Sequence, residues 1–501
     1  MSGHRLVMVL ALVLVETTVF SASFGAPLRR GLRWLHRRHL STITPGFDRA
    51  FYLRQFAGSS REGQVASDPL LHYVIVGWRE GRAPSAGFDP WHFGRLNPDF
   101  PRNVDPLLLH GRSQGAGTPC HELAGRGRDR GELPGQAGIL TIHHARGGGS
   151  GTYLDLFEEN ERARGFNVVR LRALPGAEAL GAVDENAGPA DAMRSRIFDL
   201  ALDLPGLADY CRSRRIVRLV VNHLIDRPTE ALHWIKRLGS MLGCGYEVIL
   251  HDYFALCPRV TMVTGASDFC DAAPVATCAA CTKSHGSEVK GLDPYRWRRD
   301  FLTFLEGASK LVVPSADLQA RLQTHLPAKP ISVWQPEVDE EIPEERKPCV
   351  RENEPLRVLS IGALSIPKGA YVLAALAREA RTRREPLTFT LIGAGPDALL
   401  ARAGVQATGF YRPADLDRLI DAADPHVVFL PSIWPETWSF VLTHALRRGL
   451  PVVAFDIGAP AQRLRELGRG HLVPLALATD SPGLLQVFRR LRHHYTSRQG
   501  A

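Results

Sequence analysis

Glu436 and Thr437 stand in a loop whose surroundings suit the binding of an anion. The apolar run from His426 to Leu430 is short, rich in β-branched residues and followed by a proline, as expected of a buried parallel strand. Apolar residues recur at helical spacing from Trp438, with Thr437 as the candidate N-cap and Gly449 as the stop. The loop between a strand's carboxyl end and a helix is where open α/β sheets bind ligands, and its free amides favour a diphosphate.

Lys368 stands at the start of another predicted helix. The residues from Arg357 to Ala363 read as a strand, and Lys368 and Gly369 lead into the helix expected over Ala370 to Ala377. An ammonium group beside a helix N-terminus is a suitable counter-charge for a phosphate group. Lys368 is therefore a second candidate for chemistry on a phosphate.

Glycines and a histidine mark strand ends in the first half of the chain. The strand expected over Gly138 to His143 runs into a glycine-rich turn that includes Gly148 and Gly149, and then into an amphipathic helix. Such glycines let a backbone approach a ligand closely, and a plain strand-to-helix connection is the alternative. His251 ends the strand around Ile249, where the alternative to ligand binding is a structural hydrogen bond.

Asn222 and His223 end the neighbouring strand, around Val220. Their place at a strand's carboxyl end makes them candidates for the lining of a ligand cleft. For His223, a satisfied structural hydrogen bond is the alternative.

The elements that must position these residues alternate along the chain. Strands are expected around Val220, Ile249, Val312 and Val333, with helical stretches between them, and the second half repeats the pattern. This alternation predicts an α/β fold with parallel sheets.

The ordered motifs from Gly138 to Leu475 resemble a known family. Its hallmark is a glutamate, seven intervening residues and a second glutamate, and this chain has Glu436 and His444 at those positions. The family's G-x-L-x-x-x-K-G motif is present in this chain and ends at Lys368 and Gly369. The chain resembles bacterial retaining glycosyltransferases of the GT-B fold, the glycosyl transferases group 1. The resemblance implies two Rossmann-like domains facing across a cleft, preceded by a small, mainly helical repeat module.

The resemblance also implies roles for residues. Glu436 and His251 would contact the donor sugar, Lys368 the diphosphate, and His444 the ribose. Asn222 and His223 would line the acceptor cleft. The remaining residues expected to bind the donor nucleotide are glycines and a threonine at strand ends and helix starts: Gly148, Gly149, Gly369, Gly393, Gly395 and Thr437. No cofactor is implied for catalysis.

Two positions depart from the family pattern. His444 replaces the second glutamate, and Ala363 stands where many members carry an arginine that acts as a second phosphate clamp. A neutral imidazole offers one donor and one acceptor where a carboxylate accepts from both ribose hydroxyls. We therefore expect weaker or differently selective nucleotide binding.

Four of the eight cysteines are clustered after the strand around Ile249. They are Cys257, Cys270, Cys278 and Cys281, in the pattern C-x12-C-x7-C-x2-C. Four thiolates would satisfy a tetrahedral structural zinc site. Reduced thiols and disulfides are the alternatives, and the expected cytoplasmic location makes disulfides the least favoured.

The amino terminus and the charge balance bear on location. The 501 residues carry a net charge of +9, which suits an acidic ligand, an anionic membrane surface or a nucleic acid, and no nucleic-acid motif is present. An apolar block within Leu6 to Phe24 precedes a basic flank, Arg29 to His39, that contains Trp34 and Leu35. A peripheral or inserted anchor at the cytoplasmic face of the inner membrane is favoured, with a cleaved signal and a wrongly chosen start codon as alternatives.

An internal repeat follows the basic flank. FDRAFYLRQF at Phe47 matches FDPWHFGRLNPDF at Phe88, and the DPLL stretch at Asp68 matches a shorter copy at Asp105. Similar repeats accompany many bacterial polysaccharide glycosyltransferases, and a role in docking or spacing is favoured over glycan binding. The predicted organisation has five parts. In chain order they are a membrane-proximal segment (1–40), the repeat module (41–112), a Gly/Arg-rich linker (113–137), an acceptor-side domain with the cysteines (138–345) and a donor-side domain (346–501).

These features together predict a glycosyltransferase. It would move a sugar from a nucleotide-sugar donor to a glycan or lipid-linked acceptor with retention of configuration, in cell-surface polysaccharide synthesis. The alternatives are a catalytically impaired scaffold of a polysaccharide assembly complex, and a GT-B nucleotide-sugar epimerase or sugar-phosphate synthase.

Overall fold

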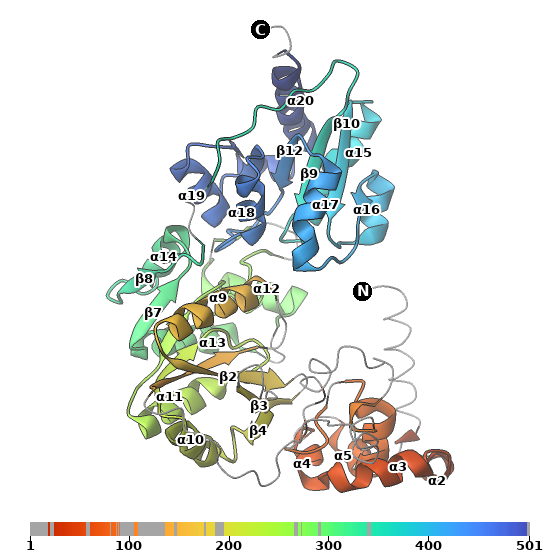
Figure 1. The fold of residues 1–501 in the computed structure, drawn as a ribbon, viewed down its shortest axis with the longest axis vertical. Coiled ribbons are helices and arrows are strands. Elements are labelled where there is room, and N and C mark those ends of the chain that lie inside the picture. The colour runs from red at the N-terminus through yellow and green to blue at the C-terminus, as the bar shows by residue number, and fades with distance from the viewer. Residues whose placement is uncertain are drawn as a thin grey trace. The chain divides into compact units, whose positions relative to one another are not determined.

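A computed structural model describes most of the chain. The described residues are 19–20, 25–56, 61–80, 82–86, 88, 90, 105–108, 136–144, 148–174, 177–185, 195–264, 269–271, 273–288, 292–337 and 342–497. They divide into two compact units, Met1–Val248 and Ile249–Ala501 (Figure 1). The predicted linker over 113–137 and most of the apolar block before Phe24 lie outside the described residues. The predicted domain boundaries stay a prediction.

The first unit begins with short helices. They are α2 (Gly25–Leu35), α3 (Arg37–Ile43), α4 (Arg49–Arg54), α5 (Glu62–Ala66), α6 (Pro69–His72) and a π-helical turn (Tyr73–Gly77). The prediction of a mainly helical module is confirmed here. Most of the second FD copy, beyond Phe88 and Pro90, lies outside the described residues.

Aromatic side chains form the core of this module. Tyr52 and Tyr73 are fully buried with ring centroids 5.8 Å apart, and the Tyr52 hydroxyl bonds His72 Nδ1 at 2.8 Å. The aspartates that open the two DPL copies hold the basic flank: Asp68 accepts hydrogen bonds from Arg33 Nε and Nη2 at 2.6 and 2.7 Å, and Asp105 bonds His39 at 2.7 Å. The repeated motif therefore ties α2 and α3 to the module.

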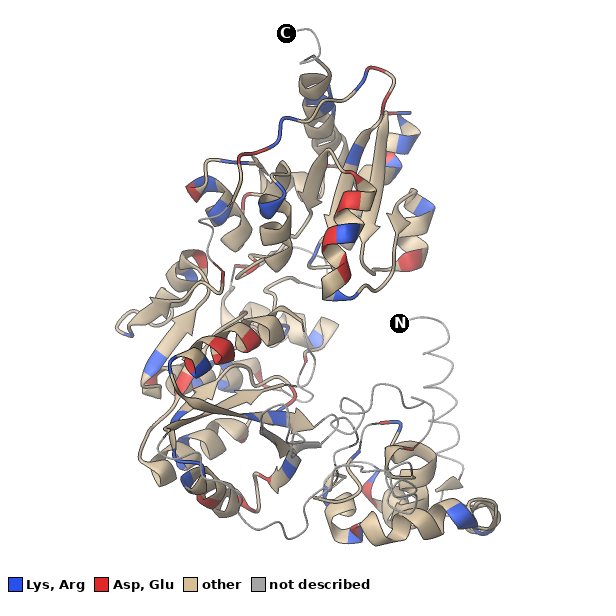
Figure 2. Cartoon of the chain, in the orientation of Figure 1, with Lys and Arg blue, Asp and Glu red and all other residues tan. Residues whose placement is uncertain are grey.

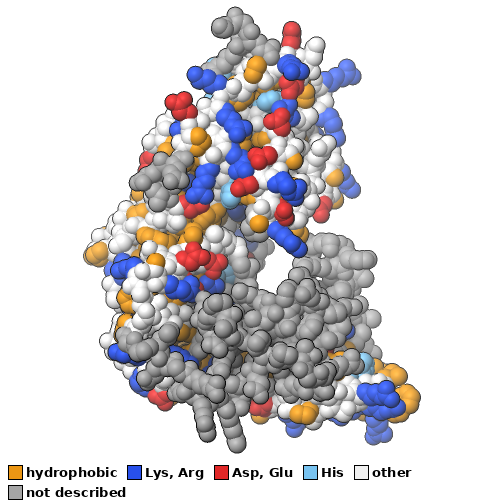
Figure 3. All heavy atoms as spheres, viewed as in Figure 1, with side chains coloured by type: hydrophobic (Ala, Val, Ile, Leu, Met, Phe, Trp, Pro, Cys, Tyr) orange, Lys and Arg blue, Asp and Glu red, His pale blue; other side chains and the backbone are white. Residues whose placement is uncertain are grey.

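Other residues of the basic flank face outward. Figure 2 marks basic residues on α2, and Figure 3 shows hydrophobic side chains gathered beside basic ones there. Trp34 and Leu35 are 66% and 68% exposed. None of the helices in the described ranges is long and apolar enough to cross a membrane.

A largely parallel sheet follows in the first unit, in the order β4-β3-β2-β1-β5-β6. Its strands are β1 (Gly138–His143), β2 (Asn167–Leu174), β3 (Ala177–Glu185), β4 (Ser195–Asp199), β5 (Ile216–Val221) and β6 (Glu247–Ile249), which ends just past the unit boundary. β3 pairs antiparallel with β2 and β4, and the other pairs are parallel. The strands predicted at β1, β5 and β6 are confirmed.

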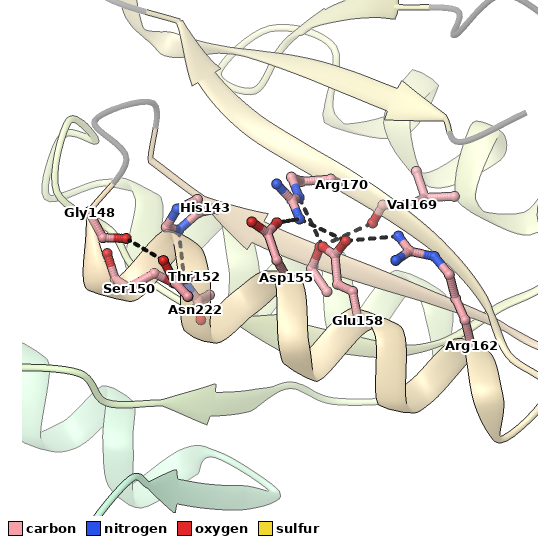
Figure 4. Close-up of polar contacts among 11 residues, drawn as sticks. His143, Gly148, Ser150, Thr152, Asp155, Glu158, Arg162, Val169, Arg170 and Asn222 are labelled. Atoms are coloured by element: carbon pink, nitrogen blue, oxygen red, sulfur yellow. Dashed lines mark hydrogen bonds and ion pairs between the residues drawn. The ribbon is translucent and has the colours of Figure 1, made fainter. Parts of the chain in front are cut away.

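Three helices accompany this sheet: α9 (Gly149–Ala163), α10 (Leu204–Ser213) and α11 (Ala231–Leu242). Buried Glu158 of α9 accepts a hydrogen bond from Thr141 of β1 at 2.7 Å and pairs with Arg162 and Arg170, each at 2.8 Å (Figure 4). This network fixes α9, and hence the turn at its start, against β1 and β2.

The second unit opens with the loop after β6 and then α12 (Val275–His285), α13 (Pro294–Gly307), β7 (Lys310–Val313), α14 (Ala316–Gln323) and β8 (Ile331–Val333). β7 and β8 pair in parallel, as predicted for the strands around Val312 and Val333. The amide of Leu250 donates to the Val312 carbonyl at 2.9 Å, so the residues just past β6 run beside β7.

A six-stranded parallel sheet forms the rest of this unit, in the order β11-β10-β9-β12-β13-β14. Its strands are β9 (Leu356–Ile361), β10 (Leu387–Ile392), β11 (Gln406–Ala407), β12 (Val427–Leu430), β13 (Val452–Phe455) and β14 (His471–Val473). The helices are α15 (Ala370–Thr382), α16 (Asp397–Ala403), α17 (Leu416–Ala423), α18 (Phe440–Arg447), α19 (Gly458–Glu466) and α20 (Ser481–Ser497).

The hydrophobic pattern explains this second sheet. β12 and β13 are buried along their whole length, as their continuous apolar runs require of strands covered on both faces. The strand order, renumbered within the sheet, is 3-2-1-4-5-6, which is that of a Rossmann fold. The predicted α/β fold class with two largely parallel sheets is confirmed; the predicted arrangement of two domains across a cleft stays a prediction.

Candidate active site

The strand order of the second sheet creates one place suited to a ligand. β9 and β12 are neighbours, but the connection from β9 leads toward β10 and that from β12 toward β13. Loops at the carboxyl ends of two such strands diverge and leave a crevice between them. The β9–α15 loop carries Lys368, and the β12–α18 loop carries Glu436.

These two loops are joined to each other. The Pro367 carbonyl accepts hydrogen bonds from the Ile433 amide at 2.9 Å and the Ser432 hydroxyl at 3.4 Å. Gly369 has a φ of +83°, and a Cβ there would overlap the Pro431 carbonyl. The predicted Lys368–Gly369 entrance to a helix is confirmed, and glycine is required because the other loop passes so close.

Lys368 and Glu436 face each other across the joined loops. The Lys368 Nζ lies 3.9 Å from Glu436 Oε1, and the two side chains are 42% and 11% exposed. The Glu436 carbonyl accepts from the Ala459 amide of α19 at 2.8 Å, so its backbone is held on the far side as well. The pair presents one positive and one negative group at the carboxyl ends of β9 and β12, which suits a ligand with both a phosphate and hydroxyl groups.

The structure corrects the predicted start of α18. The N-cap is Ser439, whose hydroxyl accepts from the Leu442 amide at 3.4 Å, and not Thr437. The Thr437 hydroxyl instead donates to the His251 carbonyl. Thr437 therefore joins the Glu436 loop to the stretch after β6, and a second such contact runs from the Tyr253 hydroxyl to the Pro435 carbonyl at 3.2 Å.

His251 is consequently brought to the loop that carries Glu436. Both residues belong to the second unit, although His251 follows a strand of the first sheet. Tyr253 was missed by sequence reasoning; its position two residues after a strand-end histidine was the available signal.

His444 lies on α18 and contacts α17. Its Nδ1 is 3.1 Å from Asp417 Oδ1, and Arg448 Nη1 is 2.8 Å from the same oxygen. Burial acts to raise the pKa of Asp417, but the hydrogen bond from His444 and the charge of Arg448 outweigh it and lower that pKa. His444 therefore occupies the position where the family has its second glutamate, and the Asp417 carboxylate on α17 orients its ring.

Gly393 and Gly395 lie at the end of β10. Gly393 has a φ of +141°, and a Cβ there would overlap the Gly362 carbonyl at the end of β9. A Cβ on Gly395 would lie 2.8 Å from Leu400 Cδ1. Close packing of neighbouring loops therefore accounts for both glycines, alongside the predicted contact with a nucleoside base.

The glycine turn of the first unit has its own cluster of polar groups. Gly148 has a φ of +85° and is followed at once by α9, which begins at Gly149. Asn222, at the end of β5, lies 2.7 Å from His143 Nδ1 and donates to the Ser150 carbonyl at 3.3 Å (Figure 4). β1 and β5 are neighbours whose connections diverge, so this is the switch point of the first sheet.

Three buried imidazoles meet at this switch point. The ring centroids of His143 and His144 are 3.9 Å apart, and those of His144 and His223 are 5.0 Å apart. His223 Nδ1 accepts the Ile225 amide at 2.9 Å, so in the neutral ring the proton is on Nε2. The sequence left a structural hydrogen bond as the alternative role for His223, and this bond is one. In the neutral ring that accepts it, Nε2 is the donor nitrogen. His143 and His144 were missed, although two successive histidines before a glycine turn gave a signal.

The clustered cysteines all lie after β6 in the second unit. The cysteines within the described residues, including these four, are unbridged. Across the described ranges, no group of three or more His, Cys, Asp or Glu side chains is already arranged to hold a metal ion.

Comparison with known proteins places one segment in a family. Residues 355–487 match the profile described as Glycosyl transferases group 1. The predicted resemblance is thereby confirmed for the sheet that carries Lys368, Glu436 and His444. No match is found among curated protein sequences.

Similar solved structures extend over more of the chain. Sucrose-phosphate synthase from Thermosynechococcus elongatus has 15% identity and a TM-score of 0.47, and the alignment covers 71% of this chain and 90% of that one. Anabaena HepE in complex with UDP-glucose has 15% identity and a TM-score of 0.41, with 72% and 93% covered. The lipopolysaccharide outer core galactosyltransferase WaaB has 13% identity and a TM-score of 0.46, with 71% and 90% covered.

Proposed function

We propose that this protein is a glycosyltransferase that moves a sugar from a nucleotide-sugar donor to a hydroxyl of a glycan or lipid-linked acceptor, with retention of configuration. The observation that carries the proposal is the Lys368–Glu436 pair, 3.9 Å apart, at the switch point of a Rossmann-ordered sheet. The family match over residues 355–487 supports the same activity.

Lys368 is assigned to the donor diphosphate. Its ammonium stands directly before Gly369 and α15, where the helix dipole also favours negative charge. As the bond from the anomeric carbon to the diphosphate breaks, negative charge grows on the leaving oxygen, and a positioned cation stabilises it. The amide of Thr437, on the loop that carries Glu436, is assigned to the same group.

Glu436 and His251 are assigned to the donor sugar. A carboxylate that is 11% exposed and held by the backbone on both sides can accept hydrogen bonds from sugar hydroxyls in one fixed geometry. The acceptor oxygen then bonds to the anomeric carbon, and its proton passes to the leaving phosphate. No metal is required in this proposal.

Nucleoside and acceptor contacts complete the assignment. Gly393 and Gly395 are assigned to the base, and His444, oriented by Asp417, to the ribose. In the first unit, Asn222 and His223, at the carboxyl end of β5, are assigned to the acceptor.

A catalytically impaired scaffold is the second candidate. His444 and Ala363, which depart from the family pattern, favour it. A nucleotide-sugar epimerase or sugar-phosphate synthase would use the same donor pocket but would consume no acceptor glycan.

Nucleoside-diphosphate release over a panel of sugar nucleotides, with and without lipid extract, separates these functions. We expect release with at least one donor, stimulated by acceptor. Release that needs only a small sugar phosphate would indicate a synthase, and interconversion of sugars without release an epimerase. The absence of both turnover and a donor-induced shift in melting temperature with every sugar nucleotide would contradict the enzyme proposal.

We further propose that α2 contacts an anionic membrane surface on the cytoplasmic side, in keeping with a role in cell-surface polysaccharide synthesis. Trp34 and Leu35 are exposed beside arginines that include Arg37, an arrangement that suits the headgroup region of a bilayer. Co-sedimentation with vesicles that contain anionic lipid should fall in the Trp34→Ser/Leu35→Ser variant. Leu202→Ser, at a site 71% exposed on another element, is the control and should bind normally.

A further inference from the structure

The four clustered cysteines line one small cavity. Cys257 follows the loop after β6, Cys270 lies between that loop and α12, and Cys278 and Cys281 lie on α12. The cavity has a volume of about 20 Å³, which is room for a single atom of the size of a water molecule. All four belong to the second unit, so the cavity is formed within one compact part of the chain.

A buried arginine approaches this cavity without a carboxylate partner among the described residues. Arg298 of α13 is 8% exposed. It donates to the Leu256 and Ala273 carbonyls, both at 3.1 Å, and to Cys278 Sγ at 3.0 Å. Because a buried guanidinium is costly unless an opposite charge lies close by, an anionic group held in the cavity would offset this cost.

We propose that Cys257, Cys270, Cys278 and Cys281 bind one Zn²⁺ ion as a structural tetrathiolate site. Four thiolates and one Zn²⁺ carry a net charge of −2, which supplies the counter-charge that Arg298 lacks among the described side chains. The thiols line the cavity but do not yet converge on one point. Binding therefore requires their side chains to turn inward, with release of the four thiol protons to solvent.

The site would stabilise the loop that carries His251. The Cys257 amide donates to the Tyr253 carbonyl at 2.7 Å, and the Tyr253 hydroxyl donates to the Pro435 carbonyl at 3.2 Å. An ion that binds Cys257 to α12 would thus fix the stretch from His251 to Cys257 at both ends. The metal has no contact with the reacting atoms, so the inference does not depend on the proposed transfer reaction.

Metal analysis of the purified full-length protein is the test. We expect about one zinc per chain, retained through gel filtration, and loss of most of it in Cys270→Ser and in Cys281→Ser. Cys349→Ser and Cys244→Ser are matched controls, because these cysteines lie outside the cavity, and both should keep the full zinc content. Arg298→Met should weaken zinc retention against a chelator by about tenfold or more, and Arg298→Lys by less.

Cobalt substitution keeps the proposal falsifiable if a cysteine variant fails to fold. The wild-type protein loaded with Co²⁺ should show the intense sulfur-to-cobalt charge-transfer bands and the visible bands of a tetrahedral thiolate site. A zinc-free wild-type protein in which all four thiols react with a thiol reagent after denaturation would overturn the proposal. So would a disulfide found by mass, or equal metal content in a variant with all four cysteines changed to serine.

Discussion

The carboxylate of Glu436 is the single group on which the proposed chemistry depends most. It is nearly buried, faces Lys368 and is held by backbone contacts of its loop. Glu436→Gln should lower kcat by about 100-fold, because the amide is neutral and replaces one of the two acceptor oxygens with an NH2 donor. Steady-state kinetics and a melting curve are the measurements, with exposed Glu352→Gln as the control. Unchanged kcat in a folded Glu436→Gln protein would contradict the assignment.

His444 offers a second prediction at the residue scale. His444→Glu should tighten nucleoside-diphosphate binding by about tenfold or change nucleotide preference, because a carboxylate accepts from both ribose hydroxyls. Calorimetric titration measures this, and a 2′-deoxy nucleotide is the control, since its gain should be smaller. Unchanged affinity together with unchanged preference would mean that this position does not contact the ribose.

Single residues were only partly predictable from the sequence. Lys368 and Glu436 were found because each stands in a loop defined by apolar runs that are visible in the sequence. The N-cap of α18 was placed at Thr437 instead of Ser439, since both are good N-caps and only the His251 carbonyl, distant in sequence, determines which is used. Arg298 gave no signal, because its importance comes from its contact with Cys278.

The close packing of the Lys368 loop gives a prediction at the scale of elements. Gly369→Ala should destabilise the protein by about 2 kcal/mol or more and weaken donor binding, because the new Cβ would displace the Pro431 carbonyl. Gly468→Ala is a matched control: its φ is +62°, but a Cβ there meets nothing within 4 Å. Chemical denaturation and donor titration should separate the two variants. Equal losses would show that backbone strain alone, and not contact between the loops, accounts for the effect.

A buried arginine supports the start of α18 from α19. Arg463 is 1% exposed, lies 4.1 Å from the Trp438 ring centroid, and donates to the Ser439 carbonyl and the Thr443 hydroxyl at 3.0 and 2.9 Å. Arg463→Met should lower the free energy of unfolding on the order of 3 kcal/mol. Arg465→Met, on the same helix with a 55% exposed side chain, should cost much less in the same denaturation experiment. Similar costs would contradict a special role for Arg463.

Elements were predicted best where the apolar run was continuous. β9, β12 and β13 were located in this way, whereas β3 and β4 were missed. The β3 sequence, AEALGAVDE, contains good helix formers, and its pairing with β2 and β4 overrides that propensity.

At the scale of the whole molecule, buried histidines predict how stability depends on pH. Burial lowers the pKa of His471, and burial followed by the charge of Arg357 lowers that of His426. A histidine with a lowered pKa binds its proton more readily in the unfolded chain, so stability is kept above about pH 6.5 and declines as pH falls below it. The melting temperature should fall between pH 7.5 and 5.5, and less steeply in His426→Asn. Exposed His285→Asn should follow the wild-type curve, and an identical slope in His426→Asn would contradict the assignment.

The class of the fold was predictable at this scale, but the strand order was not. Alternating strands and helices indicated parallel sheets, as found. The 3-2-1-4-5-6 order, which makes β9 and β12 neighbours and brings Lys368 to Glu436, depends on where each connection crosses the sheet. No local pattern in the sequence indicates on which side of the sheet each connection crosses.

The central claim is that a nucleotide sugar binds at the Lys368–Glu436 pair, with Lys368 at its diphosphate. Calorimetric titration of nucleoside diphosphates against wild-type protein, Lys368→Ala and the exposed-site control Lys347→Ala tests it most directly. We expect saturable binding of at least one nucleoside diphosphate, weakened by about tenfold to 100-fold in Lys368→Ala and unchanged in Lys347→Ala. Equal affinity in all three proteins, or no binding of any nucleoside diphosphate to the wild type, would contradict the claim.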